Sequence, residues 1–418
     1  MSQRIMVSKK RRTVIPISVL LSTLFIAFFC DVKAITSILV AGSPERSESE
    51  SGPMTYLYLC SVLGALVLSI INSQWKNRRF SNSMLFILVW VSVFYIITYY
   101  SIAPPFTSFL LFSLYTVVSF TLPSIAKIDG RLFLKASMFF VFPAIFQLNQ
   151  IFRFMYDDSE VITMGQSYAF LYPVIASVVY YFVYFKEETK IEKAVSLILF
   201  AVNSVFASYL IAYGSRGPVL SIIAVIAFCL VFPHSESGFG IKALKGRFTV
   251  FAVTTVVVVF SFISVIQQFQ DVLGNYGLSL NFVDKILRLY GGGDVTNGRQ
   301  LLYGMALTDI ADNPIFGMGF DQFNNNHGID GAAYPHNFII QTLYDGGILL
   351  LIVLAIPIIK GFTSMWKTCT LDEYAVIVAL AFSAVPRAMY SGDLWQNGPL
   401  WMLFGIVLCN KFVVRVNR

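Results

Sequence analysis

His336 is the residue best suited to acid–base chemistry, because it stands between Tyr334 and Asn337 at the start of a long apolar run. A helix beginning there would present free N–H groups and the positive end of its dipole. That field disfavours the imidazolium ion, so we expect a neutral imidazole near pH 7 that can accept a proton from a hydroxyl group. The alternatives are structural: capping the helix, or packing against Tyr334.

A second candidate is Arg216, in the turn Gly-Ser-Arg-Gly-Pro that leads into another apolar run. Glycine beside proline suits a tight turn followed by the first turn of a helix. Free backbone N–H groups, the helix dipole and a guanidinium would converge there, and this combination binds phosphate or diphosphate. Ser215 and Gly217 therefore join Arg216 as candidate ligands. An arginine that merely reaches the membrane interface is the alternative.

Three further basic residues precede His336 in the chain. Arg299 follows Gly298 and opens a candidate helix, whereas Arg288 and Lys285 lie about one turn apart on the candidate helix before it. Each is a candidate ligand for a phosphate or a sugar phosphate. The alternatives are solvated loop arginines and, for Lys285, an anchor to lipid headgroups.

Asp345 lies inside the apolar run that follows His336, directly before two glycines. A charge within a membrane helix is costly, so such a residue is expected to be functional or paired. Asp345, Tyr334 and Asn337 complete the set of candidate substrate-binding residues.

The sequence gives little support for a metal site, a known hydrolase or nucleotide-binding motif, or a disulfide framework. Asp157, Asp158 and Glu160 are clustered without a distinctive ligand spacing, so we expect no metal site there. No Walker, HExxH or GxSxG motif is present, and we expect no cofactor. The five cysteines lie in or beside apolar runs without a CxxC pair, and so predict no disulfide framework. His327, in an asparagine-rich turn, is expected to be an ordinary solvated residue.

Composition indicates the elements that must position these residues. Hydrophobic residues make up 56% of the 418 residues, charged residues only 13%, and the mean hydropathy is +0.71. The net charge of +7 comes from short clusters without an aromatic-basic face, so nucleic acid is not an expected partner. We predict an all-α, polytopic membrane bundle of about twelve transmembrane helices, forming a single domain over residues 1–418. Their expected ranges are 13–31, 55–72, 84–100, 106–126, 132–149, 166–185, 194–213, 217–232, 248–266, 336–359, 373–390 and 396–413.

The positions of lysine and arginine orient these helices. Most of the 30 basic residues fall in alternate connections, which the positive-inside rule assigns to the cytoplasm together with both termini. The first apolar run follows a basic start but has Phe28 and Phe29 before Cys30, which suits no cleavage site, so we expect it to remain as a helix. The candidate residues then collect on the outer face, whereas His234 lies on the cytoplasmic side.

The longest connection, residues 267–335, lies on that outer face. Long loops in compact proteins are usually functional or disordered, and this one is not of low complexity. Residues 280–290 and 299–311 carry apolar residues at helical spacing and are separated by three glycines. We expect two short helices resting at the membrane surface.

Five motifs in order around this connection resemble the O-antigen ligase and polymerase superfamily of bacterial membrane proteins. The resemblance covers roughly residues 200–360. The motifs are Ser215-Arg216-Gly217, Gly298-Arg299, the run from Asn313 to Gly319, Pro335-His336-Asn337 and Asp345-Gly346-Gly347.

The resemblance implies a glycosyltransferase of the GT-C type that works without metal, using a large periplasmic loop. The donor would be a glycan on undecaprenyl diphosphate. Arginines matching Arg216 and Arg299 would engage the diphosphate, and the histidine matching His336 would act at the acceptor hydroxyl. Inversion at the anomeric carbon would follow.

Within the superfamily we favour an oligosaccharide repeat-unit polymerase of the bacterial inner membrane, acting in O-antigen or related polysaccharide synthesis on the periplasmic face. Its partners would be the lipid-linked donor and acceptor, membrane lipids, and as candidates a chain-length regulator and a flippase. An O-antigen ligase that transfers polysaccharide to lipid A-core is the main alternative. A transporter or flippase for lipid-linked glycans is an alternative of a different class.

Overall fold

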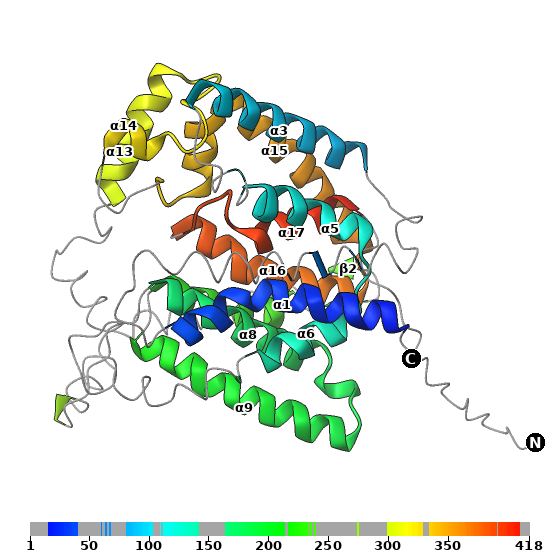
Figure 1. Ribbon diagram of the computed structural model, residues 1–418. Coiled ribbons are helices and arrows are strands. Elements are labelled where there is room, and N and C mark those ends of the chain that lie inside the picture. The colour runs from blue at the N-terminus through cyan, green and yellow to red at the C-terminus, as the bar shows by residue number, and fades with distance from the viewer. Residues whose placement is uncertain are drawn as a thin grey trace, which may run out of the picture.

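The computed structural model describes residues 16–40, 81–102, 112–140, 164–213, 216–232, 299–328, 334–390 and 392–409, and a few isolated positions. Nearly all of them are helical (Figure 1). The elements are α1 (Ile17–Val40), α3 (Asn82–Ile102), the π-helical η2 (Ser113–Val118), α5 (Ser119–Ile125), α6 (Gly130–Phe139), α8 (Met164–Val183), η4 (Phe185–Glu187), α9 (Lys190–Tyr213), α10 (Arg216–Val231), β1 (His234–Ser235), β2 (Gly238–Phe239), α13 (Arg299–Asp312), α14 (Phe323–His327), α15 (Phe338–Thr368), α16 (Leu371–Tyr390) and α17 (Gly398–Cys409).

The predicted all-helical bundle is confirmed, whereas the predicted number of about twelve transmembrane helices stays a prediction. Within the described residues, three helices are long and apolar enough to cross a membrane, at Lys190–Ser208, Phe338–Trp366 and Leu371–Tyr390, and several shorter apolar helices accompany them. Among the described residues, β1 and β2 form a two-residue antiparallel strand pair. The expected spans at 55–72 and 248–266 lie largely or wholly outside the described residues.

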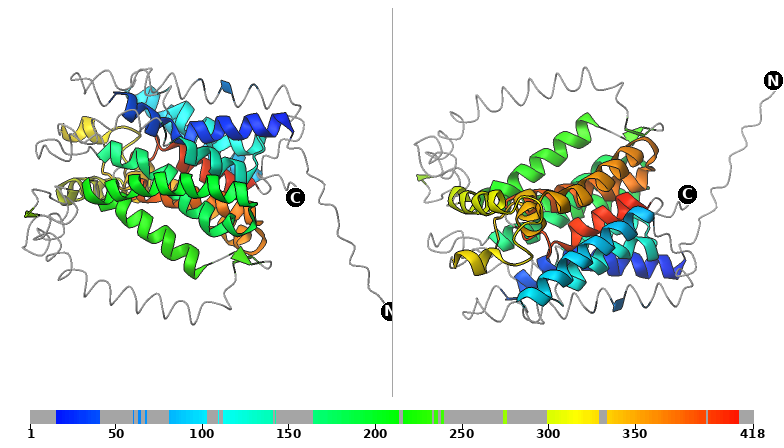
Figure 2. Two further views of the ribbon diagram at one scale, coloured as in Figure 1. Left: turned by 90° about the horizontal axis from the view of Figure 1, so that it is seen from below. Right: turned by 90° about the horizontal axis from the view of Figure 1, so that it is seen from above.

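The helices run along one common direction and pack around a shared core (Figure 2). α8 lies at the centre of one half, where α1, α6, α9, α10 and α16 contact it, and α17 packs on α5, α15 and α16 in the other half. Tyr180, Phe133 and Tyr374 are fully buried in the first half, and Trp401 and Phe120 in the second. Aromatic side chains therefore fill both halves of the interior.

Hydrogen bonds between distant segments show which helix termini lie together. The Asp129 N–H before α6 donates to Thr23 near the start of α1 at 3.0 Å, and Tyr374 near the start of α16 donates to the Phe232 carbonyl after α10 at 2.9 Å. We call this the network end. At the opposite end, the site end, the Phe320 N–H donates to Thr98 at 3.3 Å. α13, α14 and the start of α15 lie at the site end (Figures 1 and 2).

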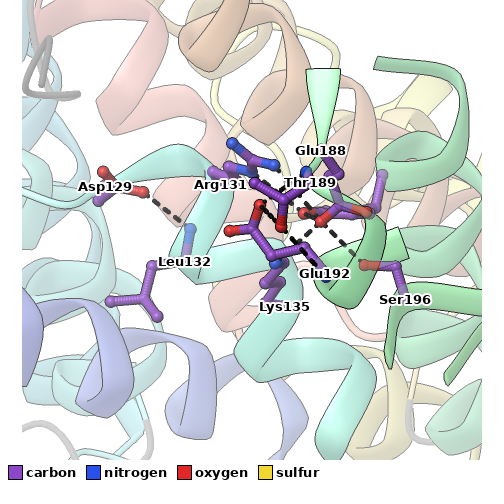
Figure 3. A network of polar contacts seen from close by, with 9 residues as sticks. Asp129, Arg131, Leu132, Lys135, Glu188, Thr189, Glu192 and Ser196 are labelled. Carbon is purple, nitrogen blue, oxygen red and sulfur yellow. Dashed lines mark hydrogen bonds and ion pairs between the residues drawn. The ribbon is translucent and has the colours of Figure 1, made fainter. Parts of the chain in front are cut away.

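Buried charges at the network end are paired around Glu188 (Figure 3). Its Oε1 atom accepts hydrogen bonds from Tyr180 and, at 2.9 Å, from Ser196, and forms ion pairs with Lys135 at 2.9 Å and Arg131 at 3.4 Å. Burial raises the pKa of the Glu188 carboxyl, but these hydrogen bonds outweigh burial and leave it below its usual value. The network ties α6 to the turn between α8 and α9.

α15 is interrupted at Gly346 and Gly347, where the backbone leaves the helical conformation. The carbonyl groups of Tyr344 and Asp345 accept hydrogen bonds from the N–H groups of Met318 and Gly319, at 2.6 and 3.1 Å. Beyond the break, the Ile348 and Leu349 N–H groups donate to the carbonyls of Pro314 and Ile315, at 2.9 and 3.3 Å. The loop 313–319 thus satisfies the backbone groups that the break exposes.

Two glycines are required for this docking. Gly347 has a φ of +64°, and a Cβ atom there would lie 2.1 Å from the Ile315 carbonyl oxygen. Gly317 has a φ of +69°, and its Cβ would lie 2.4 Å from the Tyr344 oxygen. Glycine alone adopts such backbone angles without strain and leaves room for the close approach. The two motifs, 313–319 and 345–347, are therefore the two sides of one contact.

Candidate functional site

His336 lies just before α15, and Asn337 rather than His336 caps the helix. The Asn337 side chain accepts hydrogen bonds from the N–H groups of Ile339 and Ile340, at 3.0 and 3.2 Å. His336 has a φ of +55°, in the left-handed region that is strained for a residue with a side chain. Strain of this kind is concentrated at functional sites.

The His336 ring is half-buried against the Tyr334 ring, with their centroids 4.5 Å apart. This contact is the packing alternative raised by the sequence. Among the described residues, the buried Nδ1 atom of His336 has no hydrogen-bond partner. A protonated Nδ1 would leave a buried donor unpaired, which is costly, so Nδ1 is best described as a free acceptor.

Arg299, the first residue of α13, lies close enough to His336 for its charge to act on the imidazole. The predicted helix at 299–311 is confirmed, since α13 covers Arg299–Asp312. Burial first, and then the charge of Arg299, lower the pKa of His336. The sequence predicted this direction but attributed it to the helix dipole. The imidazole is therefore neutral near pH 7, which is the form a general base needs.

Arg216 is the first residue of α10, one residue before the start that the sequence predicted. A Cβ atom on the next residue, Gly217, would lie 1.9 Å from the Tyr168 hydroxyl oxygen, so this glycine allows α8 to approach α10 closely. The Arg216 side chain lies outside the described residues, as do Ser215, Lys285 and Arg288. The acidic cluster at 157–160 is outside them as well.

Asp345 is buried at the break in α15, and its Oδ2 atom accepts a hydrogen bond from Trp395 Nε1 at 2.5 Å. The indole also packs on Phe320, with ring centroids 4.3 Å apart. This carboxylate is therefore paired, one of the two possibilities that the sequence left open. It links the break in α15 to the connection between α16 and α17.

Asp393, in that connection, is a residue that the sequence did not single out. Its Oδ1 atom accepts hydrogen bonds from Gln341 Nε2 at 2.6 Å and from the Trp395 N–H at 3.0 Å. Burial, together with the charge of Asp393, raises the pKa of Tyr334 to about 12, while Arg387 acts in the opposite direction. Asp393 therefore belongs to the surroundings of the Tyr334–His336 pair.

Asp321 is a second acidic residue that the sequence missed. It lies in the loop before α14 with a φ of +59°. The surrounding protein and the charge of Asp393 raise its pKa to about 6. Asp393 therefore acts on both Asp321 and Tyr334, while Arg299 acts on His336 from α13. Within the described residues, no group of three histidine, cysteine or acidic side chains is placed to hold a metal ion.

This arrangement suits the transfer of a group from an anionic leaving group to a hydroxyl. A neutral histidine with a free acceptor nitrogen can take a proton, and a nearby guanidinium can hold a phosphate. Residues 201–355 match the Wzy_C family, O-antigen ligase. The resemblance drawn from the motifs is thereby confirmed over that stretch. No curated protein matches the chain.

Wzy_C proteins are bacterial membrane enzymes that transfer glycans, as ligases or polymerases, and the family implies lipid-linked glycan substrates. The matched stretch contains His336, Arg299 and Arg216, and also both sides of the contact at the break in α15. Asp393 and Arg387 lie beyond it in the sequence. The site at the end of the bundle thus combines the Wzy_C stretch with the last two helices.

Proposed function

We propose that this protein is an oligosaccharide repeat-unit polymerase of the bacterial inner membrane, which joins undecaprenyl-diphosphate-linked repeats on the periplasmic face. The observation that carries the proposal is the neutral, half-buried His336, whose Nδ1 atom has no partner among the described residues, beside the cation Arg299. The Wzy_C match supplies the substrate class. Twelve spans with both termini cytoplasmic, as the basic residues predict, would place the site end in the periplasm.

The proposed reaction is a displacement at the anomeric carbon of the donor sugar. The acceptor hydroxyl oxygen forms the new glycosidic bond as the bond from that carbon to the diphosphate oxygen breaks. The bonding electrons leave with undecaprenyl diphosphate, and His336 Nδ1 takes the hydroxyl proton. Arg299 and Arg216 stabilise the charge that develops on the leaving diphosphate. Attack opposite the leaving group inverts the anomeric configuration.

The test is elongation by purified protein in detergent, with lipid-linked repeats extracted from the host membrane as the substrate. We expect a ladder of longer lipid-linked glycans on a gel. Activity without a membrane also separates this proposal from a flippase, which needs two compartments. Substrate that stays at one repeat unit under all conditions would contradict the polymerase.

An O-antigen ligase is the second candidate, and the description of the matched family favours it. The phenylalanine-rich composition, with 39 such residues, is our reason for placing the polymerase first. Deleting the gene in its host distinguishes the two. Surface glycan of a single repeat indicates the polymerase, whereas accumulated lipid-linked polymer with bare core indicates the ligase.

A further inference from the structure

Asp309 in α13 is the centre of a polar network that joins three helices at the site end. Its Oδ2 atom accepts a hydrogen bond from Tyr344 in α15 at 3.0 Å and lies 2.8 Å from His327 Nε2 at the end of α14. Asn326 Nδ2 in turn donates to the Tyr344 hydroxyl at 2.8 Å. Because a carboxylate only accepts, His327 carries its proton on Nε2. His327 is therefore bound to Asp309, and is not the solvated loop residue that the sequence suggested.

Apolar contacts beside this network determine how α13 is rotated. Leu302 and Ala306 are buried in one cluster with Phe323 and Tyr344. Arg299, Leu302, Ala306 and Asp309 follow one another at spacings of three, four and three residues, which places them on one face of α13. The face that carries Asp309 into the network therefore also carries Arg299 towards His336.

Asp309 and Arg299 each act on the segment that forms or precedes α15, at two points along α13. Asp309 meets Tyr344 in α15, while Arg299, about 15 Å earlier along α13, acts on His336, which precedes α15. The two segments thus run in the same direction here, with one contact near each end of the shared stretch. A shift of α13 at Asp309 would be carried to Arg299 by the rigid helix.

We propose that Asp309 is a positioning residue, which sets the rotation of α13 through Tyr344 and His327 and so holds the Arg299 guanidinium against the diphosphate and beside His336. The part that concerns the diphosphate rests on the proposed function. The part that concerns His336 does not, because it is visible in the free protein. Replacing Asp309 is expected to change kcat more than KM, since a misplaced Arg299 charge stabilises the leaving group less well.

The direct test is the titration of His336 by NMR in protein labelled on histidine. The chain has three histidines, so the His234, His327 and His336 signals are assigned with single variants. Arg299→Gln removes a positive charge, and the His336 titration is expected to move to higher pH. Asp309→Ala is expected to move it in the same direction, and the double variant no further than Arg299→Gln alone.

The groups that face His336 besides Arg299 must stay unchanged in this comparison. They are the Tyr334 ring, on its own segment, and Asp393 and Arg387, which act on Tyr334 from the connection after α16 and from α16 itself. Neither substitution touches them. Asp312→Ala is the matched control, because this carboxylate is exposed and ends the same helix.

Two conservative variants keep the proposal testable if Asp309→Ala folds poorly. Asp309→Asn retains an acceptor oxygen and is expected to preserve the His336 titration. Tyr344→Phe keeps the buried ring but removes the hydroxyl, and is expected to move the titration upward less than Asp309→Ala does. The kcat of elongation is expected to fall about tenfold in Asp309→Ala.

The outcomes separate this proposal from the function itself. If Arg299→Gln moves the His336 titration and Asp309→Ala lowers only the unfolding midpoint, Asp309 is merely structural and the proposal is overturned. If neither variant moves it, the coupling of Arg299 to His336 is absent and the proposal also fails. If the titrations follow the expected pattern while no glycan is elongated, positioning stands and the polymerase does not.

Discussion

At the network end, the Oε1 atom of the buried Glu188 carboxylate is bound by donors and cations, whereas at the site end the buried Nδ1 atom of His336 has no hydrogen-bond partner among the described residues. Both ends hold polar groups in an apolar bundle, where unpaired groups are costly. Lys135 and Arg131 offset the charge of Glu188. At His336 a strained backbone and an unused acceptor coexist. An unpaired buried atom alone does not mark a site, since the carboxylate of Asp31 and the Oε2 atom of Glu188 also have no hydrogen-bond partner among the described residues. His336 differs because its unpaired atom, its strained backbone and the nearby charge of Arg299 occur together.

His336→Asn removes the base and has the largest expected effect. Asparagine tolerates the left-handed backbone at this position, so the unfolding midpoint is expected to stay near that of the native protein. Glycan elongation is expected to fall on the order of 10²- to 10⁴-fold, the usual contribution of general acid–base catalysis. Elongation by the purified variant and its thermal unfolding measure the two quantities.

The matched control for that change is His234→Asn, in β1 beyond α10. It makes the same substitution near the network end, away from the site. Elongation is expected to be unchanged. A His336→Asn protein that kept native activity would contradict the catalytic role of the site end.

Glu188→Gln tests the opposite end and is expected to affect stability rather than transfer. It removes the charge that Lys135 and Arg131 face in a buried setting, and breaking such a pair costs about 3 kcal/mol. The unfolding midpoint should fall, while the elongation rate per folded molecule stays native. Glu187→Gln, one residue earlier and exposed, is expected to change neither. Loss of kcat in folded Glu188→Gln would show that the ends are coupled.

Local sequence signals predicted the helices that position the site. The starts of α10 at Arg216 and of α13 at Arg299 follow from glycine and proline beside apolar runs. The first helix was expected over residues 13–31, whereas α1 covers Ile17–Val40 and carries the buried Asp31, which is 1% exposed, within it.

Long-range contacts in the site could not be read from the sequence. Asp393 looks like an ordinary acidic residue between two apolar runs, and its partner Gln341 stands 52 positions earlier. His327 looks solvated until Asp309, 18 positions earlier, lies against it. The dipole argument for His336 predicted the right direction for its pKa, but burial and Arg299 are the causes. Burial and the charge of Arg299 depend on which segments the fold brings together.

Asp321→Asn tests, through the pH dependence of the unfolding midpoint, whether a carboxylate at the site end lowers stability. Because the folded protein raises the pKa of Asp321 from 3.8 to about 6, the charged carboxylate is less favourable in the folded state than in the unfolded one. The native protein therefore loses stability from this group as pH rises from about 4 to about 6, and the loss stays constant at higher pH. Asparagine removes the loss and tolerates the positive φ. The gain in unfolding midpoint should be larger at pH 7.5 than at pH 4, and an equal gain at both would contradict the charge argument.

Gly304→Ala has the smallest expected effect. It tests whether α13 acts as a rigid helix or must bend during transfer. Gly304 lies inside α13, and a Cβ atom there would meet nothing within 4 Å. Alanine in a helix interior is more favourable than glycine by about 1 kcal/mol, so the midpoint should rise slightly. If α13 acts as a rigid arm between Asp309 and Arg299, elongation stays native or improves. A fall in kcat with a raised midpoint would mean instead that transfer requires α13 to bend.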